Sequence, residues 1–389
     1  MKVLEVLKAN WNYPTRVLVG AGRINEIGTE CLARGIKAPL LVTDPGIASL
    51  PMTAQVLATC EAAGLKVRCF SHIKPNPTGQ NIVEGAASFL QGKHDGVIAL
   101  GGGSALDAGK SIALIAQQSC ALWDLEDIGD NHKNANPEKI APVIAIPTTA
   151  GTGSEVGRAG LIVNEGERRK VIIFHPQMMP VSVILDPEVT LGLPAHLTAA
   201  TGMDALSHSL EAWCSPGFHP MAEGIALESI RLVRRHLERV VTDGSDVDSR
   251  LQMQVASMMG ATAFQRGLGA MHALAHPLGA LYDAHHGLLN AVLMPYVLTA
   301  NANVIDAKVG RLAGYIELAP DFDAFMNWVL SLREAIGIPH TLAGVIERDE
   351  SFDKVGEMAV LDPSAGGNPI QFSADEYQQI LRNAFDGIL

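Results

Sequence analysis

The run VIALGGGSALDAGKSIALIA, residues 97–116, decides the fold of the first half of this 389-residue chain. Residues 97–100 are apolar and predict a buried strand, three glycines follow, and a helix-like segment comes next. Glycines at such a turn let the backbone bend sharply and approach a ligand closely. Ser104 can cap the helix and Asp107 can reach back to it, so we expect the free amides of the helix start to face the loop. Such a helix start attracts pyrophosphate.

Two other interpretations of this run remain open. A tight strand-to-helix turn needs no ligand at all. Residues 104–111 also read S-x-x-x-x-G-K-S, one residue short of the phosphate loop of nucleotide hydrolases. The glycine of that loop's first turn is missing, however, and the predicted helix start places Lys110 nearly two turns away from the helix mouth.

Two further apolar runs, residues 39–43 and 143–146, have the same strand pattern and also end in turns of small or polar residues. Helix-like segments separate the runs, which is typical of a parallel sheet covered by helices. In open α/β sheets, ligands bind at the carboxyl ends of the strands. The first half is therefore predicted to be an α/β nucleotide-binding domain with a Rossmann-like parallel sheet.

Polar residues that follow the runs at residues 39–43 and 143–146 are candidates for contacts with the nucleotide. The hydroxyls of Thr148, Thr149 and Thr152, in PTTAGTGSE (residues 147–155), could bond phosphate, ribose or carboxamide groups. Asp44 could accept hydrogen bonds from an adenosine ribose and would repel a ribose phosphate, which favours NAD over NADP. Asp44 could equally open the turn DPG.

After VSVILDPEVTLGLP, residues 181–194, the sequence changes to long amphipathic stretches with helical spacing. Examples are residues 197–213, 222–241 and 323–336. We therefore predict two domains, an α/β domain over residues 1–190 and an all-helical domain over residues 191–389.

Composition narrows the class of protein. A formal net charge of −12 argues against a nucleic-acid partner, because binding a phosphate backbone needs clustered Lys and Arg. The five cysteines show no CxxC spacing, which fits a reducing compartment. The start MKVLEVLKANWNYP lacks the pattern of a secretory signal, and we read no run of about 18 apolar residues. A cytoplasmic protein without a membrane partner is expected.

Four of the thirteen histidines lie in MHALAHPLGALYDAHHG, residues 271–287. His272 and His276 are four residues apart and would share one helix face. We expect Pro277 and Gly279 to interrupt that helix, so that His286 returns from a loop. The role of the adjacent His285 is left open.

Upstream, TGMDALSHSLEAW places Asp204 and His208 at the same spacing of four. Two helices with these faces inward could supply one oxygen and up to four nitrogens to a single cation, and such donors suit Fe(II), Zn, Ni or Mn. The alternatives are a spacing that arises by chance and a helix cap formed by Asp204 from Thr201.

The chain resembles the iron-containing, group III alcohol dehydrogenases, a family that includes lactaldehyde and propanediol oxidoreductases. The resemblance rests on motifs in the same order: KPNPT (residues 74–78), GGGSALDAGK, PTTAGTGSEV, DPEVTLGLP, TGMDALSH and HALAHPLGALYDAHHG. It implies an N-terminal α/β nucleotide domain and a C-terminal helical metal-binding domain, a dehydroquinate synthase-like fold.

The resemblance also implies site residues. The metal ligands would be Asp204, His208, His272 and His286, with Fe(II) as the cation and His276 beside it as the catalytic residue. NAD would be bound by Asp44, Asn76, Gly103, Ser104, Thr148, Thr149 and Lys170. From the two loops themselves, we also expect contacts from Gly102, Asp107 and Thr152. A homodimer or larger homo-oligomer is expected.

The implied reaction is hydride transfer between a metal-held alkoxide and nicotinamide, with a small alcohol or aldehyde as substrate. Because an imidazole exchanges protons near neutrality, His276 is the candidate for passing the alcohol proton to solvent. Arg266 could face an anionic substrate or could be an ordinary helix-surface residue.

The alternatives are a metal-independent maleylacetate-type reductase, a zinc polyol dehydrogenase of the same fold, and the phosphate-loop hydrolase. Retention of all four ligand positions speaks against the first of these.

Overall fold

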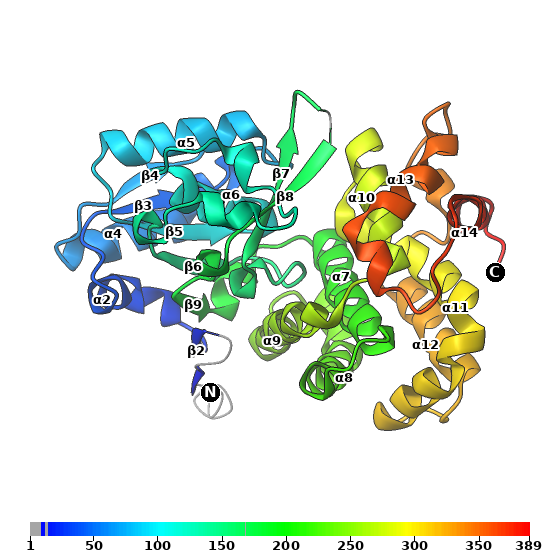
Figure 1. Ribbon diagram of the computed structural model, residues 1–389. Helices are drawn as coiled ribbons and strands as arrows, with labels where there is room; N and C mark the ends of the chain where they lie inside the picture. Colours follow the sequence, from blue (N-terminus) through cyan, green and yellow to red (C-terminus); the bar gives the residue numbers. More distant parts are fainter. Residues whose placement is uncertain (1–8, 12–14, 168) are drawn as a thin grey trace. The chain divides into compact units, whose positions relative to one another are not determined.

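The computed structural model describes residues 9–11, 15–167 and 169–389, and it divides into two compact units (Figure 1). The first unit runs to Thr149 and resumes over Gly153–Gly192. The second consists of Ala150–Thr152 together with Leu193–Leu389.

The first unit contains a mostly parallel sheet. Its strand order is β1-β2-β9-β6-β5-β3-β4, and only the pair β1·β2 is antiparallel. The strands are β1 (Ala9–Trp11), β2 (Arg16–Val19), β3 (Pro39–Val42), β4 (Arg68–Phe70), β5 (Gly96–Gly101), β6 (Val143–Pro147) and β9 (Ser182–Leu185). The predicted parallel α/β sheet is confirmed, and β3, β5 and β6 are the three strands that the apolar runs indicate.

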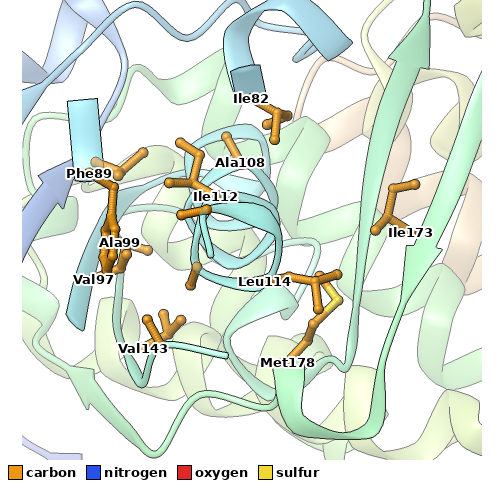
Figure 2. Packing of buried hydrophobic residues seen from close by; sticks show 14 of the residues in the cluster. Ile82, Phe89, Val97, Ala99, Ala108, Ile112, Leu114, Val143, Ile173 and Met178 are labelled. Carbon is orange, nitrogen blue, oxygen red and sulfur yellow. The ribbon is translucent and has the colours of Figure 1, made fainter. Parts of the chain in front are cut away.

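Helices cover both faces of this sheet because side chains alternate along each strand. Leu40 and Val42 of β3 pack with α5 (Gly79–Gln91) and α6 (Gly103–Ile115), in the cluster that Figure 2 shows in part. Leu41, between them, belongs to a second cluster that includes residues of α2 (Ile27–Ala33) and α4 (Pro51–Ala62). Burial on both faces explains why these strands are apolar throughout.

The order of the strands reverses between β3 and β5. The chain leaves β3 for β4 on one side and then returns to place β5 on the other side of β3. Such a switch point opens a crevice at the carboxyl ends of the two strands, which is where open α/β sheets bind their ligands. Asp44, after β3, and Gly101, at the end of β5, both lie there.

A second sheet in this unit is the hairpin of β7 (Ala159–Asn164) and β8 (Arg169–Phe174). It is joined to the KPNPT segment, because the amide of Val163 donates to the carbonyl of Pro77 over 2.8 Å. Lys170 pairs with Val163 in this hairpin.

The second unit is helical in its described residues, in agreement with the sequence. Its α-helices are α7 (Ala195–Cys214), α8 (Pro220–Thr242), α9 (Val247–Ala263), α10 (Ala270–Tyr282), α11 (His286–Tyr315), α12 (Phe322–Ala335), α13 (Val355–Leu361) and α14 (Ala374–Asp386). The central helix is α7, which packs against α8, α9 and α11 and is buried along most of its length.

One described helix, α11, is long and apolar enough to cross a membrane by length and composition, although we read no such run in the sequence. Most of its apolar window, 67%, is buried against the rest of the protein, as in the core helix of a globular unit.

The predicted cap of α6 is wrong. The helix begins two residues earlier than expected, at Gly103, so the N-cap is Gly102 and Ser104 already lies in the first turn. The Ser104 hydroxyl donates to the Pro75 carbonyl instead. The Asp107 carboxylate accepts from the Ser154 hydroxyl, over 2.5 Å, and from an amide of β7.

Lys110 is buried beneath the hairpin and does not face the glycine loop. Its ammonium group donates to the carbonyls of Ser154 and Ala159 and lies 3.3 Å from the Asp107 carboxylate. A lysine that is 1% exposed and bound to internal carbonyls has no freedom to cradle phosphate. This placement argues against a phosphate-loop hydrolase.

Candidate functional site

Asp204 and His208 project from the same face of α7, because four residues nearly complete one helical turn. The helix starts at Ala195, so Thr201 lies well inside it and the alternative that Asp204 caps a helix from Thr201 is excluded. Both side chains are buried, at 2% and 4% exposure. A carboxylate so deep in a helical core needs partners that compensate its lost hydration.

The second source of imidazoles is α10, which carries His272 and His276 on one face. The expected break at Pro277 and Gly279 is wrong, since the helix runs through both to Tyr282. Proline removes one backbone donor in a helix interior, and the packing of α10 against α11 and α13 holds the helix together across it. The helix ends at Asp283, whose φ of 51° is left-handed.

His286 does not return from a loop, as expected, but is the first residue of α11. His285 is the N-cap of this helix, and its Nδ1 accepts from the Leu288 amide over 3.3 Å. The next residue, Gly287, lies against α7, where an added Cβ would be 2.5 Å from the Ala200 carbonyl oxygen and 3.1 Å from the Asp204 Cβ. Glycine at this position lets the start of α11 come close enough for His286 to reach Asp204.

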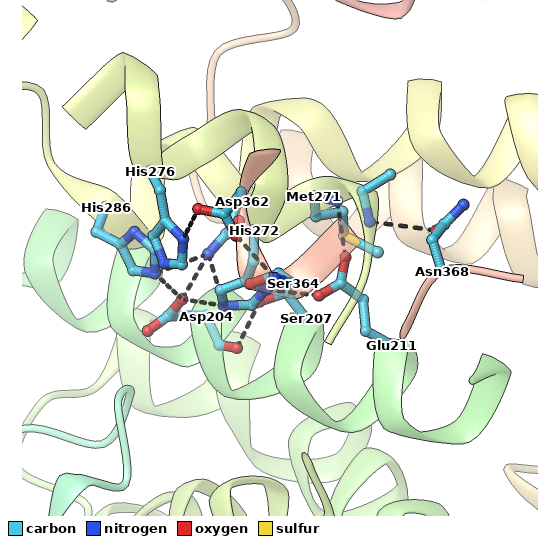
Figure 3. A network of polar contacts seen from close by, with 12 residues as sticks. Asp204, Ser207, Glu211, Met271, His272, His276, His286, Asp362, Ser364 and Asn368 are labelled. Carbon is cyan, nitrogen blue, oxygen red and sulfur yellow. Dashed lines mark hydrogen bonds and ion pairs between the residues drawn. The ribbon is translucent and has the colours of Figure 1, made fainter. Parts of the chain in front are cut away.

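Figure 3 shows three members of the resulting cluster, Asp204, His272 and His286. One potential ligand atom from each of these residues and from His208 lies within 4.8 Å of the others. The Asp204 Oδ1 is 3.7 Å from the His286 Nε2 and 4.0 Å from the His272 Nε2. These distances are too long for hydrogen bonds. The four potential ligand atoms are nevertheless close enough together for one cation to bind them all.

The chemistry of the donors fits a divalent cation. Acceptor atoms that converge on one point repel one another, and a cation at that point would remove the repulsion. One carboxylate oxygen with imidazole nitrogens suits Fe(II) or Zn.

The side chain of Asn290, four residues after His286 on α11, lies among the potential ligand atoms. Its Nδ2 donates to the Asp204 Oδ1 over 2.9 Å and lies 3.2 Å from the Nε2 atoms of His272 and His286. The positive end of its amide dipole therefore points at the place where the donors converge.

The charges in the cluster interact strongly. Burial opposes ionisation of Asp204, but the nearby imidazoles, His208 first, lower its pKa to about 2. Burial lowers the pKa of His208 to about 4 despite the attraction of Asp204, so this imidazole is neutral at pH 7 and free to act as a ligand. Burial also opposes protonation of His272, but the adjacent Glu211 carboxylate outweighs it and raises the pKa.

His276 lies beside the cluster, with its ring stacked on that of His286 at 5.3 Å between centroids. Its Nδ1 is 2.8 Å from the Asp362 carboxylate, which follows α13 in the chain (Figure 3). The carboxylate can only accept, so Nδ1 carries the proton and Nε2 is left as an acceptor. Burial opposes the charge of Asp362, and the bond from His276 lowers its pKa overall.

In the first unit, several of the predicted nucleotide contacts meet at the switch point. An added Cβ on Gly101, whose φ is 146°, would lie 3.5 Å from the Asp44 Oδ2, and one on Gly102 would lie 3.4 Å from the Thr149 side chain. The amide of Thr148 donates to the Gly101 carbonyl over 3.0 Å. The N-terminus of α6 has no side-chain cap, so its first amides can take a phosphate.

Asp44 has two roles available. Its Oδ1 accepts from the Ile47 amide over 2.9 Å and caps the short helix α3 (Pro45–Ala48), as the turn interpretation predicts. Its Oδ2 faces the glycine loop.

The other predicted nucleotide contacts are spread more widely. Ser104 bonds to the KPNPT segment that contains Asn76, and Lys170 lies on the hairpin attached to that segment. Both carboxylate oxygens of Asp107 accept hydrogen bonds within the protein, one from Ser154 and one from β7. Thr152 belongs to the short stretch that is grouped with the helical unit, where the neighbouring Gly151 packs on Thr201.

Arg266 does not present its guanidinium to a substrate. It donates to the carbonyls of Ala212 and Trp213 at the end of α7 and to that of Gly217, and it pairs with Glu223 at 2.8 Å. Its side chain is only 4% exposed. The free carbonyls at a helix C-terminus attract a cation, which explains this placement. These contacts do not support the hypothesis of an anion-binding arginine.

Three residues of this network were not anticipated from the sequence. Glu211 lies seven residues after Asp204 and Asn290 four after His286, so helical spacing could have indicated both. Asp362 is 86 residues from His276, and no local pattern indicates it.

The structure thus combines an α/β unit that has a glycine loop at its switch point with a helical unit that has a buried cluster of imidazoles and one carboxylate. This is the two-domain fold that the family resemblance implies. Residues 14–187 match the family model for iron-containing alcohol dehydrogenase. Residues 198–385 match the model for the C-terminal part of the Fe-containing alcohol dehydrogenase family.

The chain belongs to the iron-containing alcohol dehydrogenase family. It is 39% identical to a 4-hydroxybutyrate dehydrogenase from Cupriavidus necator, over 96% of this chain and 98% of that one. It is 32% identical to an NAD-dependent methanol dehydrogenase from Bacillus methanolicus, over 96% and 99%. A crystal structure of a 1,3-propanediol oxidoreductase superposes with a TM-score of 0.90 at 34% identity, over 95% and 97% of the chains. The protein is an alcohol-type oxidoreductase.

Substitution of Gly287 tests the close contact between α11 and α7. In the Gly287→Ala variant, the new methyl group would meet the Ala200 carbonyl, and we expect a loss of about 1–3 kcal/mol of unfolding free energy, measured by urea denaturation. Gly224→Ala is the matched control, because Gly224 lies within α8 with open space around it and alanine favours a helix. Equal stability of the two variants would contradict the close contact.

Proposed function

We propose that this protein is an NAD-dependent alcohol dehydrogenase. Its proposed cation is Fe(II), as the family name suggests, and the proposed ligands are Asp204, His208, His272 and His286. The observation that carries the proposal is the convergence of one carboxylate and three imidazoles within 4.8 Å in the core of the helical unit. When bound, a divalent cation there supplies Lewis acidity, which favours loss of the hydroxyl proton of an alcohol. A bound NAD would supply the hydride acceptor, so that the alcohol would be oxidised to an aldehyde.

The residues of this chain prepare the site for that reaction. The neutral imidazole of His208 and the ionised carboxylate of Asp204 are the protonation states that a cation requires of its ligands. His276 is proposed to accept the alcohol proton at Nε2, since Asp362 holds the other ring nitrogen as a donor. The side chain of His276 is 18% exposed, so it can pass the proton on to solvent.

Two features of the first unit support NAD. The uncapped start of α6 and the glycine loop at the switch point suit a pyrophosphate, and Asp44 adds a negative charge at the end of β3. A relative is named as an NAD-dependent methanol dehydrogenase. Gly102, Gly103, Ser104, Thr148 and Thr149 are proposed as contacts of the dinucleotide, with Asn76, Thr152 and Lys170 as further ones.

A small alcohol or aldehyde is the proposed substrate. The relatives named above act, by their names, on methanol, 1,3-propanediol and 4-hydroxybutyrate. With Arg266 bound to helix carbonyls, neutral alcohols are the first choice for a substrate panel, and 4-hydroxybutyrate is the anionic member that should be included.

The proposed location is the cytoplasm and the proposed assembly is a homodimer or larger homo-oligomer. A reducing compartment fits five cysteines without CxxC spacing. The molar mass in solution, measured by light scattering, tests the assembly, and a single-chain mass of 41.2 kDa would contradict it.

Removal of the metal tests the function directly. Protein treated with a chelator should lose its alcohol-dependent reduction of NAD while still binding NADH, and anaerobic addition of Fe(II) should restore turnover. The physical reason is that the converging donors alone cannot replace the Lewis acid. Full turnover in the presence of chelator would favour a metal-independent reductase instead. Restoration by Zn(II) alone would favour the zinc polyol dehydrogenase alternative.

Replacement of Asp44 by asparagine tests the choice of dinucleotide. The side-chain oxygen of asparagine can still cap α3, but the charge that would repel a ribose phosphate is gone. We expect the ratio of kcat/KM values for NAD over NADP to fall by about tenfold, equivalent to about 1.4 kcal/mol. The melting temperature is the control, and an unchanged ratio in a stable variant would refute this role of Asp44.

His276→Ala tests the proton acceptor. We expect kcat to fall by about 10²–10⁴-fold, because a positioned acid–base group contributes on that scale. NADH binding should be unchanged, and added imidazole should restore part of the activity. A variant with the kcat of the wild type would show that the proton takes another route.

A further inference from the structure

A second buried carboxylate, that of Glu211, lies on the same helix as two of the proposed ligands. Glu211 follows Asp204 by seven residues and His208 by three on α7, so all three side chains lie along one side of the helix. Its side chain is 4% exposed. Neither its burial nor its place is explained by the four ligands alone.

One oxygen of Glu211 binds the ring of His272. The Glu211 Oε2 is 2.6 Å from the His272 Nδ1 (Figure 3). An ionised carboxylate offers only acceptors, so His272 must carry a proton on Nδ1. In the neutral ring this leaves a lone pair on Nε2, the atom that lies 4.0 Å from the Asp204 Oδ1. The contact therefore selects the tautomer that can bind a cation.

The other oxygen of Glu211 binds the backbone of α10. Its Oε1 accepts from the Met271 amide over 2.7 Å. The N-cap residue of α10, Gly269, has no side chain to cap the helix, and the Ala270 amide is taken by the Asn368 side chain over 3.2 Å. Glu211 thus holds both the start of α10 and a ring carried by its first turn, so the ring cannot turn independently of the helix.

The charges lead to the same role. Asp204 and Glu211 are two buried carboxylates, and the ion pairs that they form among the described residues are with histidines, not with Lys or Arg. One divalent cation bound by neutral imidazoles would balance two negative charges in this part of the helical unit.

We propose that Glu211 is a positioning residue of the metal centre, which fixes the tautomer and ring orientation of His272 and supplies the second negative charge that balances a divalent cation. This inference rests on the proposed function, since it presupposes that His272 is a ligand. Carboxylates that orient metal-binding histidines typically change metal affinity by about 10–100-fold when they are removed.

The test compares metal binding by Glu211→Gln with that of the wild type. Glutamine has one acceptor oxygen, so it can satisfy the Met271 amide or the His272 Nδ1–H but not both. With its amide group toward the ring, it would favour a proton on Nε2, which blocks ligation. We expect affinity for Co(II), measured by competition with a chelating dye, to fall about 10–100-fold.

Two additional measurements separate positioning from a loss of structure. The visible absorption bands of bound Co(II) should shift in Glu211→Gln, because the geometry of a ligand changes, whereas the affinity for NADH should stay the same. The matched control is Glu228→Gln, which removes a carboxylate that pairs with Arg231 on α8. This control should bind Co(II) with wild-type affinity and spectrum.

Each outcome decides the matter. Wild-type Co(II) affinity and spectrum in folded Glu211→Gln would overturn the role of Glu211 and leave the proposed function intact. Failure of the wild-type protein to bind one equivalent of Co(II) would overturn the metal centre itself, and this inference with it.

If Glu211→Gln does not fold, Glu211→Asp takes its place. Aspartate keeps the carboxylate, but its side chain is one methylene group shorter. We therefore expect a Co(II) affinity between that of the wild type and the value, about 10–100-fold lower, that is expected for Glu211→Gln. A folded Glu211→Asp protein with wild-type affinity and spectrum would likewise overturn the proposal.

Discussion

The buried carboxylate of Asp204 is the constraint on which the helical unit depends. A charge in the core of a helical unit is tolerated only when groups around it replace the lost water. Here the partners come from three helices: His208 beside it on α7, His272 on α10, and His286 and Asn290 on α11. The packing of these helices and the electrostatics of the cluster therefore depend on each other. Gly287 contributes to both, because it lets α11 approach α7.

Much of this arrangement could be predicted from local spacing. Helical periodicity is a property of a few consecutive residues, so the pairs Asp204 with His208 and His272 with His276 were identified from the sequence. The apolar runs that became β3, β5 and β6 were equally clear, because strands buried on both faces are apolar throughout. The resemblance to a known family added His286 as the fourth proposed ligand.

What could not be predicted depends on contacts between distant segments. Pro277 normally ends a helix, yet here neighbouring helices hold α10 together across it. Asp107 reaches Ser154 instead of the start of its own helix, since a residue 47 positions away offers it a hydroxyl. The partner of His276, Asp362, comes from the far end of the chain. In each case tertiary packing overrides the local preference.

The guanidinium of Arg266 donates to the last carbonyls of α7, and this contact restricts which parts of the sequence can vary. Only a few residues separate Arg266 from His272. The hydrogen bonds of Arg266 therefore fix the position of the start of α10 relative to α7. The beginning of α10 could therefore not shift along α7 without displacing the ring of His272, a proposed ligand. The sequence can vary more freely at the other end of α10, past Pro277, where the chain turns at Asp283.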